Sequence, residues 1–193
     1  MQKIGLFFGT FDPIHNGHLT LANHFANETD LDAVWLVITP QNPFKQNSKM
    51  LPNTERLELV SRAIKGHPKL EISTVEFELP KPNFTYETLS HLAKNNPKRK
   101  FVLLMGEDNI ISFPQWKEYQ SIIEKHEIYV YPRKNDGQIP DEFLNHPKIT
   151  WTNAPLIDIT SSQIRQWIKE GENVKSFLPS ASWIYLDEKG FYR

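Results

Sequence analysis

The sequence predicts an α/β fold, in which a doubly wound, mostly parallel sheet is covered by helices and a small helical part follows at the C-terminal end. Short apolar runs alternate with helical patterns along the chain, which favours strand-helix-strand units with right-handed crossovers. Several runs, such as "AVWLVI" and "FVLLM", are almost continuously apolar, which is typical of strands buried on both faces. The chain of 193 residues is 39% hydrophobic, which is enough for one domain with a real core.

Six segments are predicted as strands because each is a short apolar run of strand length. In chain order they cover residues 4–8, 33–39, 71–77, 100–105, 127–131 and 148–152. In sheets of this kind, ligands bind beyond the carboxyl ends of the strands. The residues that directly follow each strand are therefore the first candidates for a functional site.

Helices are predicted between the strands from apolar stripes at helical spacing. In residues 53–65, for example, Asn53 suits the N-cap position, and Leu57, Val60 and Ile64 fall along one face. The predicted helices cover residues 17–27, 53–65, 85–94, 115–125, 161–170 and 179–187. We expect a single domain over residues 1–193, in which residues 158–193 form a helical, phosphate-binding subregion.

Composition excludes several classes of function. The 22 basic and 23 acidic residues leave a net charge of −1, which argues against a nucleic-acid-binding surface. Cysteine is absent, so disulfides, a thiol nucleophile and a thiolate metal site are excluded. No run approaches the ~20 apolar residues of a membrane-spanning helix, and we expect a cytoplasmic protein with no membrane or nucleic-acid partner. The sequence is compatible with a homo-oligomer.

The stretch GTFDPIHNGH, residues 9–18, joins the first predicted strand to the first predicted helix. Gly9 lets a ligand come close to the backbone, and Gly17 opens the helix. His15 and His18 fall on one side of its first turn, beside N–H groups that attract anions, where two imidazoles could donate hydrogen bonds to a polyphosphate. The alternatives are an ordinary capped turn with surface histidines, and a metal site, for which HxxH without a third ligand is weak evidence.

Two further stretches carry groups that could hold phosphate. DITSSQIR, residues 158–165, has the pattern of a helix N-terminus, with hydroxyls at Thr160, Ser161 and Ser162 and a cation, Arg165, one turn later. TPQNPFKQ, residues 39–46, is a proline-pinned loop whose Lys45 could reach a phosphate as a mobile point charge. A plain helix cap and a surface lysine are the respective alternatives.

Taken together, these stretches resemble the signatures of the nucleotidyltransferase superfamily, whose members transfer a nucleoside monophosphate from a triphosphate. GTFDPIHNGH is similar to the T/HxGH motif, and DITSSQIR is similar to the ISSTxIR element. The resemblance implies a Rossmann-like nucleotidyltransferase fold in which hydroxyls, N–H groups and an arginine hold the phosphates of ATP. The ATP-binding residues that it implies are Gly9, Thr10, Phe11, His15, His18, Gly106, Asp108, Ser161, Ser162 and Arg165.

The middle of the chain resembles the bacterial nicotinate-mononucleotide adenylyltransferases in particular. PNFTYETL at residues 82–89 is similar to their sYTxxTL element, and FVLLMGEDNIISFPQWKEY at 101–119 is similar to their fiiGxDxlxxfxxW segment. We expect Trp116, at the start of the predicted helix 115–125, to stack on a pyridine ring. Free N–H groups at that helix start and the charge of Lys117 would suit the carboxylate of nicotinate. The substrate-binding residues implied are Lys45, Thr85, Trp116 and Lys117.

Three aromatic residues depart from the family pattern. Phe8 stands where a glycine is usual, Phe44 where a histidine is usual, and Phe84 in the position of a tyrosine. The resemblance implies positions near the site for Arg56 and Arg133. The residues alone define no motif for either, and on that ground we predict both as surface charges.

The resemblance implies transfer of AMP from ATP to nicotinate mononucleotide, which gives nicotinate adenine dinucleotide and pyrophosphate in NAD biosynthesis. The acceptor's own phosphate would be the nucleophile, because a phosphate monoester with a second pKa of about 6 is largely dianionic near neutrality. The implied catalytic residues are His15, His18, Lys45 and Arg165, with Mg²⁺ held mainly through the ATP phosphates and no metal site of the protein's own. The alternatives are a nicotinamide-mononucleotide or dual-specificity adenylyltransferase, a phosphopantetheine adenylyltransferase, and a non-catalytic nucleotide-binding module.

Overall fold

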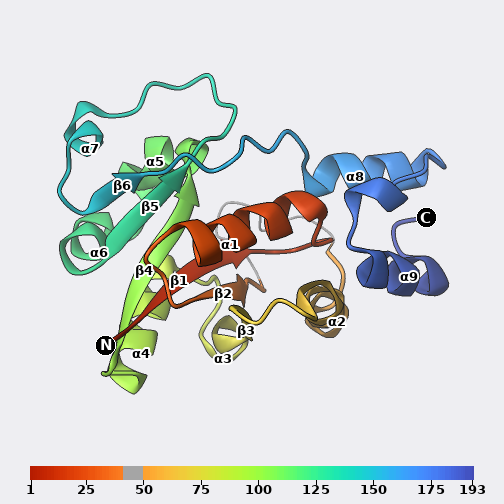
Figure 1. Cartoon of the computed structure of the whole chain (residues 1–193), viewed down its shortest axis with the longest axis horizontal. Coiled ribbons are helices and arrows are strands. Elements are labelled where there is room, and N and C mark those ends of the chain that lie inside the picture. The colour runs from red at the N-terminus through yellow and green to blue at the C-terminus, as the bar shows by residue number, and fades with distance from the viewer. Residues whose placement is uncertain (41–49) are drawn as a thin grey trace.

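A parallel sheet forms the centre of the protein in a computed structural model that describes residues 1–40 and 50–193 (Figure 1). Within these residues the sheet has six strands in the order β3-β2-β1-β4-β5-β6, and every neighbouring pair is parallel. The strands are β1 (Gln2–Gly9), β2 (Ala33–Ile38), β3 (Leu70–Ser73), β4 (Arg99–Gly106), β5 (Glu127–Tyr131) and β6 (Ile149–Trp151). The predicted doubly wound α/β fold is therefore confirmed.

Helices connect the strands and extend the chain beyond the sheet. The longer ones are α1 (Asn16–Glu28), α2 (Asn53–Ile64), α4 (Thr85–Asn95), α8 (Ser161–Lys169) and α9 (Ser180–Lys189). The shorter ones are α3 (Val75–Glu78), α5 (Glu107–Ser112), α6 (Tyr119–Lys125) and α7 (Asp141–Leu144), with 3₁₀ turns η2 (Phe113–Gln115) and η3 (Lys175–Phe177). In the part of the chain described, no helix is long and apolar enough to cross a membrane.

Two apolar clusters cover the two faces of the sheet, because successive strand side chains point to opposite faces. Phe7 packs on one face with residues of α1, α2, α8 and α9, whereas Leu6 packs on the other with residues of α4, α5 and α6. The C-terminal helices α8 and α9 lie together at one end of the molecule, near α1 and α2 (Figure 1). The predicted C-terminal helical part thus joins the core of one face.

The strand order reverses between β1 and β4. From β1 the chain winds outward through β2 and β3, and from β4 it winds the other way through β5 and β6. A crevice opens at such a switch point, outside the carboxyl ends of the two central strands. In this protein those ends are Gly9 and Gly106, so the fold itself selects the place where the candidate residues should be sought.

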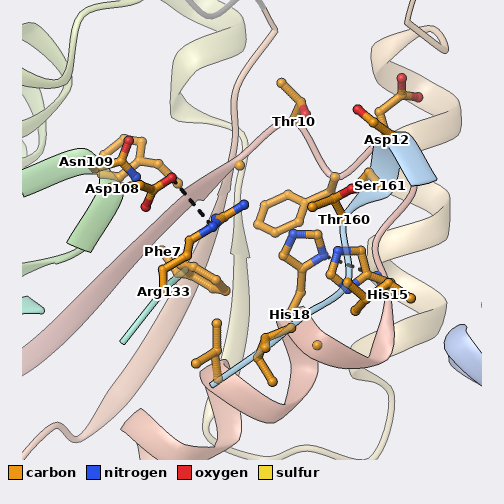
Figure 2. A pocket seen from close by; sticks show the side chains of 18 of the residues that line it. Phe7, Thr10, Asp12, His15, His18, Asp108, Asn109, Arg133, Thr160 and Ser161 are labelled. Atoms are coloured by element: carbon orange, nitrogen blue, oxygen red, sulfur yellow. Dashed lines mark hydrogen bonds and ion pairs between the residues drawn. The ribbon is translucent and has the colours of Figure 1, made fainter. Parts of the chain in front are cut away.

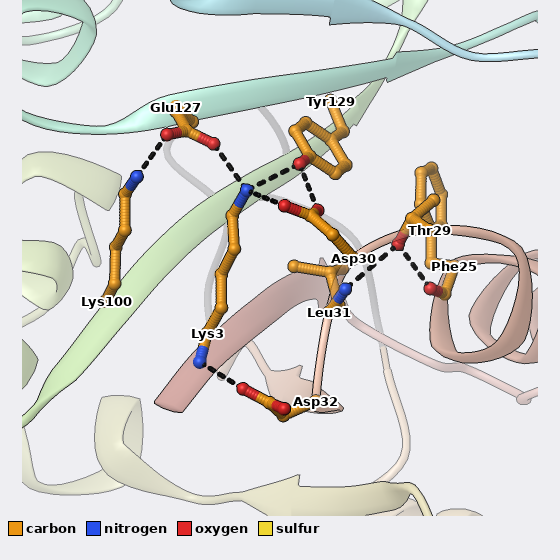
Figure 3. A network of polar contacts seen from close by, with 9 residues as sticks. All are labelled: Lys3, Phe25, Thr29, Asp30, Leu31, Asp32, Lys100, Glu127 and Tyr129. Carbon is orange, nitrogen blue, oxygen red and sulfur yellow. Dashed lines mark hydrogen bonds and ion pairs between the residues drawn. The ribbon is translucent and has the colours of Figure 1, made fainter. Parts of the chain in front are cut away.

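A polar network ties the amino ends of the central strands together (Figure 3). The Lys3 ammonium forms ion pairs with Asp30 at 2.6 Å and with Glu127 at 2.7 Å, and it donates a hydrogen bond to the Tyr129 hydroxyl at 2.7 Å. Burial opposes the charge, but these three partners raise the pKa of Lys3 above its ordinary value. The network lies at the edge of the sheet opposite to the switch-point crevice.

The predicted strand 71–77 is wrong in its second half. The strand ends at Ser73, and residues 75–78 form the helical turn α3. This turn buries the carboxyl of Glu76, which accepts a hydrogen bond from the Thr88 hydroxyl at 2.7 Å on α4. Short apolar runs do not distinguish a strand from a buried helical turn, and a contact with α4, outside the run, decides the outcome.

The predicted helix 115–125 is wrong at its start. Phe113, Pro114 and Gln115 form the 3₁₀ turn η2, Trp116 follows it with extended backbone, and α6 begins only at Tyr119. The Trp116 N–H donates to the carbonyl of Phe113 at 2.9 Å. Trp116 is therefore not at a helix start as expected, and its own N–H is already bonded. Helices α5 and α7 were also not predicted.

Candidate active site

A cavity of about 660 Å³ opens at the switch point, within the size range of small-molecule sites (Figure 2). Its walls come from the carboxyl ends of β1 and β5, from α5, and from the first turns of α1 and α8. Predicted residues from the first motif that line it are Gly9, Thr10, Phe11, His15 and His18. Predicted residues from the other elements that line it are Asp108, Ser161, Ser162 and Arg165.

The turn between β1 and α1 is shaped by its two glycines. Phe11 has a left-handed backbone (φ 47°), and its buried ring folds back so closely that a Cβ on Gly9 would lie 2.8 Å from it. A Cβ on Gly17 would overlap the side chain of Ile157, which belongs to the segment leading into α8. Both glycines thus allow close packing within the protein, and Gly17 brings the first motif against the second.

His15 and His18 stack on each other at the start of α1, with ring centroids 3.6 Å apart and planes at 28° (Figure 2). The His15 backbone N–H donates to Nδ1 of His18 at 3.2 Å. A backbone N–H can only donate, so Nδ1 of His18 carries no proton. When the ring is neutral its proton is on Nε2, which is left as a hydrogen-bond donor.

Both imidazoles are neutral at neutral pH in the absence of bound phosphate. Burial lowers the pKa of His15 to about 4, and the charge of Arg133 adds to this effect. Burial also lowers the pKa of His18 well below its ordinary value, with further contributions from His15 and Arg133. An anion entering the cavity would oppose these effects, since a nearby negative charge favours the protonated form.

The N-terminus of α8 is docked on the first motif by the residues that were predicted to hold phosphates. Ser161 Oγ donates to the carbonyl of Pro13 at 2.9 Å, and Arg165 Nη1 donates to the carbonyl of Asp12 at 2.7 Å. Thr160 caps the helix by accepting from the Gln163 N–H at 3.2 Å. The N–H groups of Ser161 and Ser162 have no intrahelical acceptor and are available to an anion.

The opposite wall of the cavity carries a charged pair. Arg133, two residues after β5, lies 3.5 Å from a carboxylate oxygen of Asp108, which follows β4 on α5 (Figure 2). We predicted Arg133 as a surface charge. This prediction is wrong, because the residue lines the cavity. Its position just beyond the carboxyl end of a strand was the signal that could have identified it.

Arg56 was also predicted as a surface charge, and this prediction is wrong as well. Its side chain on α2 is fully buried, with 1% exposure. The guanidinium donates to the backbone carbonyls of Thr10 at 2.5 Å, Thr39 at 2.9 Å and Leu51 at 3.1 Å. Arg56 therefore fastens the first motif to the end of β2 and to the start of α2, and no motif in the sequence indicates this.

Four further predicted residues, all within the described part of the chain, do not line the cavity. Gly106 ends β4 behind Asp108, and Thr85 begins α4. Trp116 packs edge-on against Phe113, next to Gln115, which does line the cavity. Lys117 is ion-paired with Glu87 at 2.6 Å and lies over the Phe84 ring at 4.6 Å. Lys45 and Phe44 lie outside the described residues.

The groups that meet in the cavity are suited to anions. Imidazoles, guanidinium groups, hydroxyls and helix N-termini all donate hydrogen bonds or carry positive charge. Across residues 1–40 and 50–193, no group of three or more histidine, aspartate or glutamate side chains is arranged to hold a metal ion. A doubly wound parallel sheet with these groups at its switch point defines a nucleotide-binding protein of the Rossmann-like class.

Comparison with known proteins agrees with this class and narrows it. The model of the cytidylyltransferase-like family matches residues 6–167. A probable nicotinate-nucleotide adenylyltransferase of Christiangramia forsetii is 52% identical, over 100% of this chain and 99% of the relative. A probable nicotinate-nucleotide adenylyltransferase of Bacteroides fragilis is 40% identical, over 93% of this chain and 88% of the relative. The chain belongs to the cytidylyltransferase-like family and, within it, to the nicotinate-nucleotide adenylyltransferases.

Solved structures agree on the fold. Plasmodium falciparum nicotinic acid mononucleotide adenylyltransferase complexed with NaAD superposes with a TM-score of 0.83 at 19% identity, over 100% of this chain and 98% of the other. A putative nicotinate-nucleotide adenylyltransferase from Vibrio parahaemolyticus superposes with a TM-score of 0.75 at 22% identity, over 100% of this chain and 96% of the other.

Proposed function

We propose that this protein transfers AMP from ATP to nicotinate mononucleotide, producing nicotinate adenine dinucleotide and pyrophosphate for NAD biosynthesis. The observation that carries the proposal is that the histidine turn of α1 and the N-terminus of α8 line one cavity at the switch point, in a chain 52% identical to a probable nicotinate-nucleotide adenylyltransferase. These two elements are more than 140 residues apart in the sequence, as the Ser161 to Pro13 hydrogen bond (148 residues) illustrates.

The reaction is an in-line displacement at the α-phosphorus of ATP. A phosphate oxygen of the mononucleotide attacks, a new P–O bond forms, and the bond to the bridging oxygen breaks as pyrophosphate leaves with its electron pair. The attacking phosphate is largely dianionic near pH 7, so no side chain has to remove a proton. The protein's contribution is positioning of the reactants and stabilisation of charge.

In this proposal His18 stabilises the transferring phosphate through its Nε2–H, which is the free donor because Nδ1 accepts the His15 N–H. His15 stacks against it and adds a second imidazole at the same helix start. The negative charge of a bound triphosphate opposes the burial that lowers the pKa of both rings. While Nδ1 of His18 accepts the His15 N–H, this ring donates in its neutral form, from Nε2.

In this proposal Arg165, Ser161 and Ser162, which line the cavity at the N-terminus of α8, hold the polyphosphate. In the structure described, Arg165 Nη2 donates to Ser162 Oγ at 3.1 Å and its Nη1 donates to the Asp12 carbonyl. These contacts orient the guanidinium at the cavity edge before the nucleotide arrives, which reduces the ordering cost of binding.

Mg²⁺ enters, in this proposal, as part of the Mg²⁺–ATP substrate and neutralises phosphate charge. The described side chains favour this over a protein cage, since Asp108 is paired with Arg133 and Asp12 Oδ1 already accepts from Leu51 and Tyr192. Mg²⁺ usually keeps several waters and is held through substrate phosphates together with one or two carboxylates.

The acceptor, nicotinate mononucleotide, would lie toward η2 and α4. Its predicted contacts are Thr85, Trp116 and Lys117, together with Lys45. Ser112 and Gln115, the latter next to Trp116 in the sequence, line the cavity on this side. A nicotinate carboxylate would have to compete with Glu87 for the charge of Lys117.

The test is to mix purified protein with Mg²⁺–ATP and, separately, nicotinate mononucleotide, nicotinamide mononucleotide or phosphopantetheine, and to follow pyrophosphate release. We expect release to be fastest with nicotinate mononucleotide, with nicotinate adenine dinucleotide identified by chromatography. A preference for nicotinamide mononucleotide would overturn the acceptor assignment. Release with none of the three, despite ATP binding, would make the protein a nucleotide-binding module.

A further inference from the structure

The last residues of the chain return to the first motif. The hydroxyl of Tyr192, the penultimate residue, donates a hydrogen bond of 2.6 Å to Oδ1 of Asp12, 180 positions earlier. The C-terminus lies beside α8 and α9, at the end of the molecule where α8 meets the β1–α1 turn (Figure 1). Neither the motifs nor the proposed reaction accounts for this contact.

The backbone of Tyr192 is held in a costly conformation. Its φ of 66° is in the left-handed region, which Gly190 nearby (φ 64°) adopts freely but a bulky side chain seldom does. A strained residue of this kind persists where surrounding contacts over-determine it. Here the Phe191 N–H donates to the carbonyl of Leu186 at 3.2 Å, and the Tyr192 ring lies edge-on to that of Phe191.

Asp12 is the residue through which the tail reaches the cavity. Its carboxylate is buried, with 1% exposure, and lines the cavity. Oδ1 accepts from Tyr192 and from the Leu51 N–H at 3.2 Å, while Oδ2 accepts no hydrogen bond within the described residues. Among the described residues, the cation within 4 Å of Oδ2 is Arg165, whose Nη1 is 3.9 Å away and donates to the carbonyl of the same aspartate.

Asp12 therefore competes with any bound phosphate for Arg165. At 3.9 Å the carboxylate attracts the guanidinium without a direct hydrogen bond, and a small rotation of the carboxylate would close the pair. The donors from Tyr192 and Leu51 both act on Oδ1 and oppose that rotation. Removal of the Tyr192 hydroxyl would leave a buried carboxylate short of one donor and more strongly drawn to Arg165.

We propose that Tyr192 is a positioning residue for ATP: by holding the Asp12 carboxylate, it keeps Arg165 available at the edge of the cavity. This inference rests on the proposed function only in assigning Arg165 to the nucleotide phosphates. A purely structural tail would affect thermal stability and leave the affinity of the folded protein for ATP unchanged. A positioning tail affects the affinity for ATP specifically.

The test compares Tyr192→Phe with Tyr185→Phe. Tyr185 is a matched control, because its hydroxyl on α9 also donates one hydrogen bond to a carboxylate, that of Glu55 at 2.7 Å, away from the cavity. Binding of a non-hydrolysable ATP analogue is measured by calorimetry well below the melting temperature. We expect the Kd of Tyr192→Phe to rise about tenfold, the effect of one lost hydrogen bond to a charged group, and that of Tyr185→Phe to stay within twofold.

Steady-state kinetics separate the inference from the proposed function. In Tyr192→Phe the KM for ATP should rise while the KM for nicotinate mononucleotide is unchanged. A wild type that binds the analogue but transfers no AMP would overturn the proposed function, whereas the binding comparison would still test the role of Tyr192. Equal Kd values for wild type and Tyr192→Phe would overturn the inference.

A double-mutant cycle tests whether the effect passes through Asp12. In an Asp12→Asn background, the neutral amide cannot form an ion pair with Arg165, so adding Tyr192→Phe should change the Kd less than twofold. A further tenfold loss in that background would overturn the proposed route. Thermal melts identify any variant that fails to fold. If the double variant is one of these, the single variant Asp12→Asn still tests the competition. Its affinity for ATP should not be weaker than that of the wild type, because no carboxylate then competes for Arg165.

Discussion

The stacked pair His15 and His18 shows how one backbone hydrogen bond sets the chemistry of a side chain. The His15 N–H occupies Nδ1 of His18, so the neutral ring can donate only from Nε2. The second ring, 3.6 Å away, restricts rotation of the first. A donor held in this way is pre-organised for charge that develops on a phosphate.

We predict that His18→Ala retains ATP binding and loses most of its turnover. Removal of one pre-organised donor typically costs about 3 kcal/mol of transition-state stabilisation, which is a factor of about 100 in kcat. The matched control is His91→Ala, since His91 lies on α4 and its ring contacts only Asn95 among the described hydrogen bonds. Analogue binding and pyrophosphate release check the two halves of the prediction, and unchanged turnover in His18→Ala would contradict it.

The low pKa of His15 also predicts a dependence of stability on pH. Burial lowers this pKa from 6.5 in the unfolded chain to about 4 in the folded protein, so the unfolded state binds more protons between those values. The free energy of unfolding should therefore fall as the pH is lowered from about 6.5 to about 4, and this contribution should level off below that.

Urea unfolding at pH 7 and pH 4.5 measures the effect as a difference between proteins. Between these two pH values the wild type should lose about 2 kcal/mol more than His15→Gln, whose side chain does not titrate. Equal losses in the two proteins would show that the buried ring does not carry the effect.

Sequence patterns identified the residues of the site that lie next to strand ends and helix starts. His15, His18, Ser161 and Arg165 are of this kind, because the residues around them define the backbone that places them. Arg56 and Tyr192 could not be found in this way. Their partners are distant in the sequence, Thr10 and Thr39 for Arg56 and Asp12 for Tyr192, and only the folded chain brings them together.

Among the elements, α2 has the clearest double role, since it packs on the core and carries the buried Arg56. The guanidinium bonds three backbone carbonyls and also the Asn53 side chain at 2.6 Å. These carbonyls belong to the ends of β1, β2 and the segment before α2. A single side chain thus fixes where three parts of the chain meet beneath the cavity.

We predict that Arg56→Met lowers the free energy of unfolding by about 3 kcal/mol, because it leaves buried carbonyls without donors. Arg56→Lys should not restore stability, since one ammonium cannot reproduce the planar fork of donors. Arg62→Met on the same helix is the control, as its 2.7 Å pair with Glu58 is exposed and should be worth less than about 0.5 kcal/mol. Denaturant unfolding of the three variants measures these changes in the free energy of unfolding. A loss in Arg56→Met no larger than that in Arg62→Met would contradict the prediction.

Element boundaries were predictable where local sequence decides them and not where packing does. The predicted strand 127–131 matches β5, while the predicted helix 115–125 missed the turn η2 and the left-handed Glu118 (φ 54°) before α6. An apolar stripe continues through such a turn, because side chains on both sides of it face the same core. Phe113, for example, contacts both Trp116 and Tyr119.

At the scale of the whole molecule, the sheet separates two sets of polar residues. The cavity lies at the carboxyl ends of the strands, and the network of Lys3, Asp30, Glu127 and Tyr129 lies at their amino ends (Figure 3). The β1 strand joins the two, with Lys3 near its start and Gly9 at its end.

We predict that Lys3→Met lowers the free energy of unfolding by roughly 1–2 kcal/mol and leaves kcat/KM for both substrates unchanged. The largely buried ammonium has three partners, and its loss leaves them unsatisfied. Lys100→Met is the matched control, because Lys100 pairs with Glu127 from a more exposed position and should cost less than about 0.5 kcal/mol. Thermal melts and steady-state assays on the same preparations check both parts, and a loss of kcat/KM in Lys3→Met would show that the two edges are coupled.

The position of the Lys3 network has a consequence for how such a protein can diversify. Substitutions that adapt the chain to a warmer or colder habitat can accumulate at the amino ends of the strands, about seven strand residues or roughly 20 Å from the chemistry. The residues that would contact the nucleotide in the proposed function lie at the opposite rim. A lineage could therefore change its temperature range and its choice of nucleotide in separate, independently selected steps.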